Sequence, residues 1–247
     1  MLIIIDEKIP SEAKEKLSGC GELLELSTQG LTYPAISGHP DIFFCKTPTE
    51  LIVAPNLPAN YFSILDKNNV NYKVGNNRIS SEVAKWRNSE NGLYHKKHQP
   101  HHSAFIHYNA AVSEEYLVHR LEYTDPVILE QCHYLKKIAV KQGYTRCNLL
   151  FFGKDQYITS DRGIQKALQQ HLLNGLLVTS EGIVLPGFPN GFIGGTMGLF
   201  ENKVFILGSL ENYSDGLRVR KLLKQSDFEI IELFHGSLFD GGSILFI

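Results

Sequence analysis

Cysteine is scarce in this sequence, and its four cysteines are scattered. They are Cys20, Cys45, Cys132 and Cys147, in a chain of 247 residues. No two of them form a CxxC pair, so the spacing gives no sign of a zinc site. The number and spacing also lack the pattern of a disulfide framework. We therefore expect no metal, no cofactor and a cytoplasmic protein.

Long apolar runs and an excess of one charge are missing too. Met1–Ile5 is apolar, but it is too short for a signal peptide, lacks a basic start and runs directly into charged residues. No run approaches the length that spans a bilayer. The formal net charge is −2, which gives no reason to expect nucleic acid or an anionic membrane as a partner. Hydrophobic residues make up 43% of the chain, enough for a buried core.

What is present is a repeated pattern of elements, seen most clearly in residues 148–182. Its expected elements are a strand at 148–152, a turn, a strand at 157–159, a helix at 162–173 and a strand at 176–178. Ser160 or Asp161 can cap the helix, because a short side-chain oxygen accepts from free backbone N–H groups. Asn174 and Gly175 favour its end, and Gly182 closes the unit.

The same pattern recurs along the chain. The copies lie at residues 39–75, 104–143 and 191–236, with a partial copy at 1–30 and a first strand alone at 243–247. In the copy at 39–75 we expect a first strand at 42–45. In the copy at 104–143 we expect a first strand at 104–108 and a helix at 127–137, which Thr124 or Asp125 can cap before Pro126. The two partial copies complement each other, so the terminal strands complete one unit. We predict an α/β fold of five ββαβ units in a ring that the N-terminal and C-terminal strands close, as one domain over 1–247. An ordinary α/β sheet is the alternative.

Residues 76–103 interrupt the pattern as a long insertion. Residues 94–102 hold four histidines: His95, His98, His101 and His102. A metal site and a solvated surface loop both fit such a tract, and we favour the loop, because sites built from one flexible tract are rare. The role of this tract is left open.

Several short motifs carry a resemblance to a known fold. They lie at Gly143–Asn148, Thr159–Gly163, Leu185–Gly187, Gly191–Gly195 and Asp240–Gly242. They resemble an uncharacterised bacterial family of the pentein, or α/β-propeller, fold. This is the fold of the guanidino-group-modifying enzymes, which include arginine and agmatine deiminases. The resemblance implies a five-bladed propeller, and its link to those enzymes is at the level of the fold.

The same resemblance implies that the deiminase residues are missing. Those enzymes use a C-terminal cysteine nucleophile, a histidine and carboxylates that bind the guanidinium. Asn109 and Asn148 stand near the carboxylate positions, the histidine segment matches Gly191–Ile193, and the nucleophile segment matches Gly241–Phe246. Neither of the last two segments contains the required residue. We therefore do not expect deimination by the family mechanism.

In a pentein the starts of the first strands meet at a central channel, which implies a candidate site here. It gathers Asp41, Asn109, Arg146, Asn148, Asn190, Asp240 and Ser243 as ligand-binding residues, with His39 and Cys147 beside them. We predict that it binds a small polar or amino-acid-like molecule. Arg146 would hold a carboxylate, and Asp41 or Asp240 an amine. Alternatively, these side chains bond to one another in a closed plug.

Two other functions stay open. Cys147 beside Arg146 could have a lowered thiol pKa and act as a nucleophile with His39 on a guanidino or amide substrate, although a buried inert thiol is the commoner outcome. The chain could also be a protein-interaction module. The sequence gives neither the ligand nor the oligomeric state.

Overall fold

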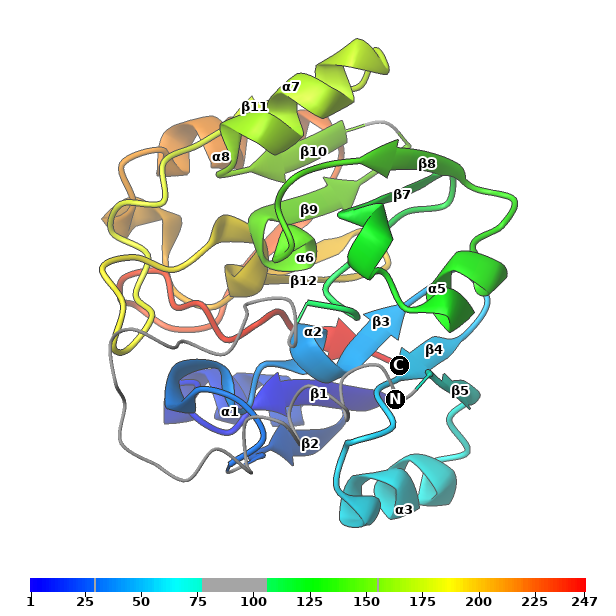
Figure 1. The fold of residues 1–247 in the computed structure, drawn as a ribbon. Coiled ribbons are helices and arrows are strands. Elements are labelled where there is room, and N and C mark those ends of the chain that lie inside the picture. The colour runs from blue at the N-terminus through cyan, green and yellow to red at the C-terminus, as the bar shows by residue number, and fades with distance from the viewer. Residues whose placement is uncertain (29, 77–105, 155) are drawn as a thin grey trace.

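The computed structural model describes residues 1–28, 30–76, 106–154 and 156–247, and these form five small three-stranded sheets (Figure 1). The sheets are β15-β1-β2 (Leu245–Phe246, Leu2–Asp6, Glu22–Leu26), β3-β4-β5 (Phe44–Lys46, Leu51–Val53, Tyr72–Val74), β6-β7-β8 (Ala111–Val112, Tyr116–His119, Lys136–Ala139), β9-β10-β11 (Leu149–Phe152, Gln156–Thr159, Asn174–Leu177) and β12-β13-β14 (Met197–Phe200, Lys203–Ile206, Glu229–Glu232). The histidine tract and most of the predicted insertion lie outside the described residues.

Every sheet has the same pairing. The first strand is antiparallel to the middle strand, and the middle strand is parallel to the last. A parallel pair needs a long crossover connection, which each unit supplies as a helical segment between its middle and last strands. The predicted α/β fold of five ββαβ units is therefore confirmed. We call the first strands β3, β6, β9, β12 and β15 the inner strands.

The two ends of the chain share one sheet, as the two partial copies predicted. Strand β15 pairs antiparallel with β1, with Ile3 opposite Phe246 and Ile4 opposite Leu245. Strand β1 is buried along its whole length. Strand β15 therefore covers the edge of β1 that β2 leaves unpaired.

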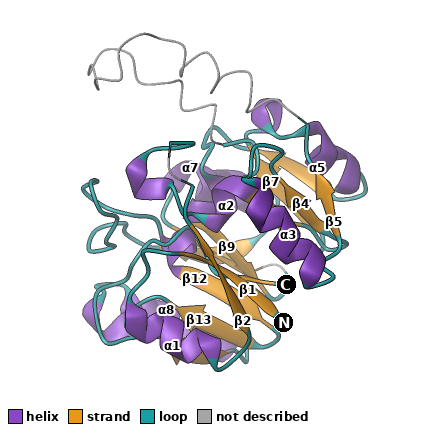
Figure 2. Ribbon diagram, turned by 90° about the horizontal axis from the view of Figure 1, so that it is seen from below, coloured by secondary structure: helices purple, strands orange, loops and turns teal. Residues whose placement is uncertain are grey.

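The crossover helices lie on the outside of the strands (Figure 2). They are α1 (Ser11–Ser18), α3 (Ala59–Lys67), α5 (Pro126–Gln131), α7 (Arg162–Gln170) and α8 (Gly216–Gln225). Each presents a buried apolar stripe, such as Ile164 and Leu168 of α7, which pack in one core cluster with Tyr157 of β10. In the part of the chain that the structure describes, no helix has the length and apolar character to cross a bilayer.

Two predicted helix starts are confirmed, and two predicted ends are wrong. The Asp161 side chain accepts from the Ile164 backbone N–H, and Asp125 caps α5 through the Val127 N–H. Helix α7 ends at Gln170 rather than at residue 173, because the chain turns at Leu172, which has a φ of 61°. Helix α5 ends at residue 131 rather than 137, and residues 136–139 form β8 instead.

The starts of the inner strands differ from the prediction. Short helical turns precede three of them: α2 (Pro40–Phe43), α6 (Thr145–Asn148) and η4 (Ile193–Thr196). Sequence reasoning placed strands from residues 42 and 148, because a single buried helical turn has the same apolar composition as a strand end. In the third unit the first strand is β6 at 111–112, and residues 106–108 lie before it in a turn. Residues 104 and 105 are outside the described range.

Candidate functional site

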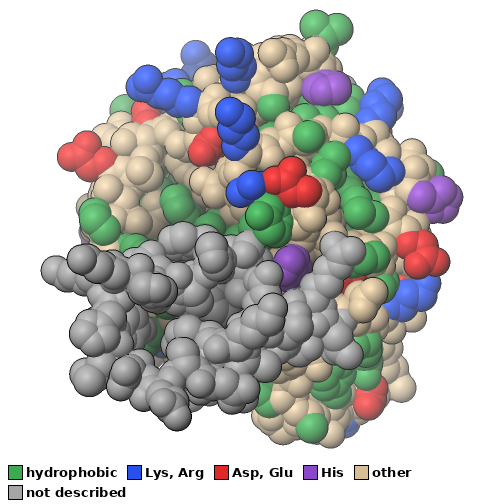
Figure 3. Space-filling model, in the orientation of Figure 1, with side chains coloured by type: hydrophobic (Ala, Val, Ile, Leu, Met, Phe, Trp, Pro, Cys, Tyr) green, Lys and Arg blue, Asp and Glu red, His purple; other side chains and the backbone are tan. Residues whose placement is uncertain are grey.

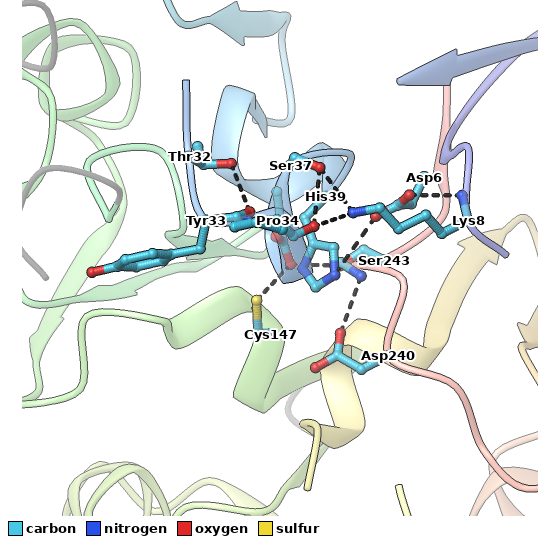
Figure 4. Close-up of polar contacts among 12 residues, drawn as sticks. Asp6, Lys8, Thr32, Tyr33, Pro34, Ser37, His39, Cys147, Asp240 and Ser243 are labelled. Atoms are coloured by element: carbon cyan, nitrogen blue, oxygen red, sulfur yellow. Dashed lines mark hydrogen bonds and ion pairs between the residues drawn. The ribbon is translucent and has the colours of Figure 1, made fainter. Parts of the chain in front are cut away.

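A group of buried polar side chains lies just before the inner strands. His39 and Asp41 precede β3, Asn109 precedes β6, Cys147 precedes β9 and Ser243 precedes β15. We call these five residues the polar cluster. Figure 4 shows that Cys147, Ser243 and His39 approach one another from segments far apart in the sequence. The short turns α2 and α6 carry Asp41 and Cys147 inward, which a continuous strand would not do.

Asp41 is the centre of the hydrogen bonds within the polar cluster. The Cys147 thiol donates to Asp41 Oδ2 at 2.9 Å, and the Ser243 hydroxyl donates to the same oxygen at 3.1 Å. Asn109 Nδ2 lies 3.2 Å from Cys147 Sγ, and Asn109 Oδ1 accepts from the Cys147 backbone N–H at 3.2 Å. Four of the five residues are thus held by one connected network.

Two buried atoms of the polar cluster have no partner among the described residues. They are Asp41 Oδ1 and His39 Nδ1. Asp41 is 0% exposed and His39 is 2% exposed. An unpartnered buried polar atom costs on the order of 1–3 kcal/mol, and native proteins rarely leave one without a reason.

Burial also sets the protonation of these groups. It raises the pKa of Asp41 to about 6, although the Cys147 hydrogen bond and the Arg146 charge oppose this. It lowers the pKa of His39 to about 3, so the imidazole is neutral at pH 7. Burial, followed by the Asp41 charge, raises the pKa of the Cys147 thiol well above its ordinary value. The raised thiol pKa and the 2.9 Å contact together favour a protonated thiol that donates to Asp41 over an activated thiolate.

Two further carboxylates flank the polar cluster. Asp240 accepts from the backbone N–H groups of Phe192 and Gly242 at 2.8 and 3.1 Å. Burial, followed by the Asp41 charge, raises the pKa of Asp240 to about 7. A Cβ on Gly195 would overlap the Asp240 carboxylate, so only glycine fits there. On the other side, Asp6 Oδ2 lies 3.8 Å from His39 Nε2.

Beyond the polar cluster, a cavity of about 310 Å³ lies between the inner strands. Residues of all five inner strands or the positions beside them line it; they include Phe44, Ala111, Leu150, Leu199 and Phe246. Arg146 also lines the cavity and donates to the Gly194 and Met197 carbonyls at 2.9 and 3.4 Å. Its side chain is partly buried, and the charges of Asp41 and Cys147 act on it from the polar cluster. The guanidinium therefore lies where the cavity meets the polar cluster.

The structure places the residues of the predicted site in three groups. It brings Asp41, Asn109 and Ser243 together around Cys147, with Arg146 and Asp240 adjacent. Asn148 points elsewhere: it donates to the Tyr144 carbonyl and accepts from Ser160. Asn190 is partly buried, and among the described residues no hydrogen bond joins it to the polar cluster.

His39 and Cys147, considered from the sequence as a base and a nucleophile, do approach each other. A ring nitrogen of His39, an oxygen of Asp41 and Cys147 Sγ all lie within 4.8 Å of one another. No hydrogen bond joins the histidine to the thiol among the described residues, so nucleophilic catalysis stays a prediction. Sequence reasoning missed the role of Asp6, since its position at the end of an apolar strand gives no sign that it faces His39.

With this geometry described, the relatives of the chain can be considered. A family model matches residues 4–88 and 93–245, almost the whole chain. The chain belongs to this family, a family of unknown function (DUF6873). No curated protein matches the sequence significantly. A solved structure with a similar fold is a cysteine-to-serine mutant of DDAH from Pseudomonas aeruginosa complexed with citrulline, at 10% identity and a TM-score of 0.48, over 89% of this chain and 77% of that one.

The surface gives less information than the interior. On the face in Figure 3, outside the part drawn in grey, acidic and basic side chains lie interspersed among apolar ones. This face carries no broad area of one charge.

Proposed function

We propose that the protein binds a small polar carboxylate of amino-acid size in the cavity between its inner strands. The observation that carries this proposal is the Arg146 guanidinium on the wall of an otherwise mostly apolar cavity. A guanidinium binds a carboxylate through two parallel N–H···O bonds. Only two N–H donors of Arg146 have partners among the described residues, so others remain for a ligand.

The size and walls of the cavity favour a small molecule. A volume of about 310 Å³ is at the lower end of the range for ligand pockets. Phe44, Leu199 and Phe246 supply apolar surface for a carbon skeleton. Such a combination of apolar walls and a few charged groups fixes both the place and the direction of a ligand.

The rim of the cavity suggests how an amino group would be held. Glu114 lies exposed on the lining, and Lys46 donates to the Phe246 carbonyl at 2.6 Å. Glu114 is therefore our choice of partner for a ligand ammonium group. The sequence expectation gave this role to Asp41 or Asp240, but neither lines the cavity.

A thermal-shift panel tests the proposal. The panel holds arginine, agmatine, citrulline, ornithine and other amino acids, with agmatine as the compound that lacks a carboxylate. A ligand at a hundred times its Kd adds about 2.7 kcal/mol of stability, which raises the Tm by several degrees. We expect at least one amino acid to do so and agmatine to have no effect.

Three variants test whether a rise in Tm comes from ligand binding in the cavity. Arg146→Gln removes the guanidinium, and Val112→Trp fills the cavity while Arg146 is kept; both should abolish the shift. Arg162→Gln, an exposed arginine on α7, is the matched control and should retain it. No shift across the panel, or a shift that survives Val112→Trp, would remove the cavity as the binding site.

A further inference from the structure

His39, Asp41 and Cys147 share a feature that carboxylate binding in the cavity does not use. Their ligand atoms, an imidazole nitrogen, a carboxylate oxygen and a thiol sulfur, lie within 4.8 Å of one another and are all buried. These are the three kinds of side chain that bind zinc in proteins. In a tetrahedral zinc site such atoms are about 3.5 Å apart, so small side-chain rotations would bring them to coordinating distance.

Two polar atoms of this group also lack a hydrogen-bond partner among the described residues. Asp41 Oδ1 and His39 Nδ1 are buried without a hydrogen-bond partner among the described residues, although Asp41 Oδ2 has two. A metal ion would use the two unpartnered lone pairs. It would also replace the proton by which Cys147 donates to Asp41, because a coordinating thiol is deprotonated.

Each of the three residues also has a neighbour of the kind that supports a metal ligand. The His39 ring has a hydrogen bond with the Asp240 backbone, and Asp6 Oδ2 lies 3.8 Å from Nε2. A backbone carbonyl is a common outer partner of a metal-binding histidine. Asn109 Nδ2 faces Cys147 Sγ at 3.2 Å, and the Ser243 hydroxyl holds Asp41 Oδ2. Such outer partners fix the orientation of ligands and strengthen metal binding.

The charges around this group favour a cation. Asp6, Asp41 and Asp240 supply three carboxylates, and the cations that act on them are Lys8, Lys14 and Arg146. Lys14 is already paired with Glu25 at 2.6 Å, which leaves Lys8 and Arg146 against the three carboxylates. When the carboxylates are ionised the balance is negative, and a thiolate would make it more so.

We propose that His39, Asp41 and Cys147 bind one zinc ion, with a water molecule in the fourth position. A mixed sulfur, nitrogen and oxygen donor set matches the preferences of zinc, whereas Mg²⁺ and Ca²⁺ take oxygen ligands. The expectation from the sequence was that no metal binds. The sequence did bring these three residues to one candidate site, but no spacing marked them as metal ligands, because they belong to two segments that are more than a hundred positions apart.

Titration of the chelator-treated full chain with Co²⁺, a coloured substitute for Zn²⁺, tests the proposal. We expect one equivalent per chain, absorption typical of tetrahedral coordination, and a thiolate-to-cobalt charge-transfer band that Zn²⁺ abolishes. In Cys147→Ser a hydroxyl can still donate a hydrogen bond to Asp41, but the charge-transfer band should disappear because the sulfur is gone. His39→Gln and Asp41→Asn should weaken binding about a hundredfold or more, since even outer partners account for about 10–100-fold.

Matched controls test whether other cysteines or histidines bind the metal instead. Cys20→Ser and Cys132→Ala alter an exposed and a buried cysteine outside the group and should leave the titration unchanged. A variant with His95, His98, His101 and His102 all changed to Gln should also keep the band. Circular dichroism confirms that each variant is folded. A band that survives Cys147→Ser, loss of binding in the four-histidine variant, or no stoichiometric binding by the wild type would overturn the proposal.

Discussion

Asp41 and Asp125 are both buried carboxylates, yet their surroundings differ. Asp125 Oδ1 accepts from the Val127 N–H, and Oδ2 accepts from the Asn76 N–H and the Tyr108 hydroxyl at 2.9 Å each. Both oxygens of Asp125 are therefore satisfied. Asp41 Oδ2 has two partners, but its Oδ1 has none among the described residues.

The histidines of the two regions repeat this difference. His119, near Asp125, bonds through both ring nitrogens, to Thr124 Oγ1 at 2.8 Å and to the Gly143 carbonyl at 2.9 Å. His39, near Asp41, has an unpartnered Nδ1. A satisfied network stabilises a fold, whereas an unsatisfied one is costly and marks a site with another purpose. The Asp125 region therefore fits a structural role, and the unpartnered atoms of the polar cluster support the proposed metal site.

The largest expected effect concerns thiol chemistry. Cys147 is buried with a raised pKa, while Cys20 is exposed. Alkylation with iodoacetamide at pH 7.5, read by peptide mass spectrometry, should modify Cys20 faster than Cys147 by about a thousandfold or more, because Cys147 must wait for an opening that costs several kcal/mol. Comparable rates would show an activated thiolate and restore the nucleophile hypothesis.

The next largest effect is on folding stability at Asp125. In Asp125→Asn an NH₂ group would face the Asn76 N–H and Tyr108 hydroxyl donors. We expect a loss of about 2–4 kcal/mol in the free energy of unfolding, measured with urea. Tyr108→Phe removes a single bond and should cost about 1 kcal/mol. Equal costs for the two variants would contradict the role of Asp125 as a shared acceptor.

His119 should make the stability depend on pH. Burial lowers its pKa to about 4 in the folded protein, against an ordinary value of 6.5. The unfolded chain therefore binds the proton first, and stability is complete above pH 6.5 and falls as the pH drops toward 4, by about 3 kcal/mol from this group. Urea unfolding of wild type and His119→Asn between pH 4 and 7.5 should show a shallower fall in the variant. Parallel curves would exclude this role.

Asp41→Asn should have the smallest effect, and of the opposite sign. The pKa of Asp41 is raised from 3.8 to about 6, so its contribution to stability is complete below pH 3.8 and is lost as the pH rises through 6. Asparagine avoids the buried charge but can still accept from Cys147 and Ser243. We expect a gain of about 1–2 kcal/mol at pH 7.5 and none at pH 4. A loss at both pH values would make the polar cluster structural.

Much of the fold could be predicted because its strands, turns and helix starts each have a local sequence pattern. Strand and turn residues repeat at regular spacing, and the Asp125 and Asp161 caps are visible in the sequence. The candidate site was only partly predictable. Asp41, Asn109 and Ser243 could be placed because they precede inner strands, but the directions of side chains on the short turns α2 and α6 could not be. Asn148, one position from Cys147, therefore faces Ser160 instead of the polar cluster.

Urea unfolding of Asp41→Asn and Asp125→Asn, each with and without Zn²⁺ at pH 7.5, tests the contrast between the two regions most directly. We predict that Asp125→Asn lowers stability but is still stabilised by zinc, as the wild type is. Asp41→Asn should be at least as stable as the wild type without zinc and should gain nothing from it. If Asp41→Asn is destabilised like Asp125→Asn and zinc stabilises neither the variants nor the wild type, the polar cluster is a structural plug and the account is contradicted.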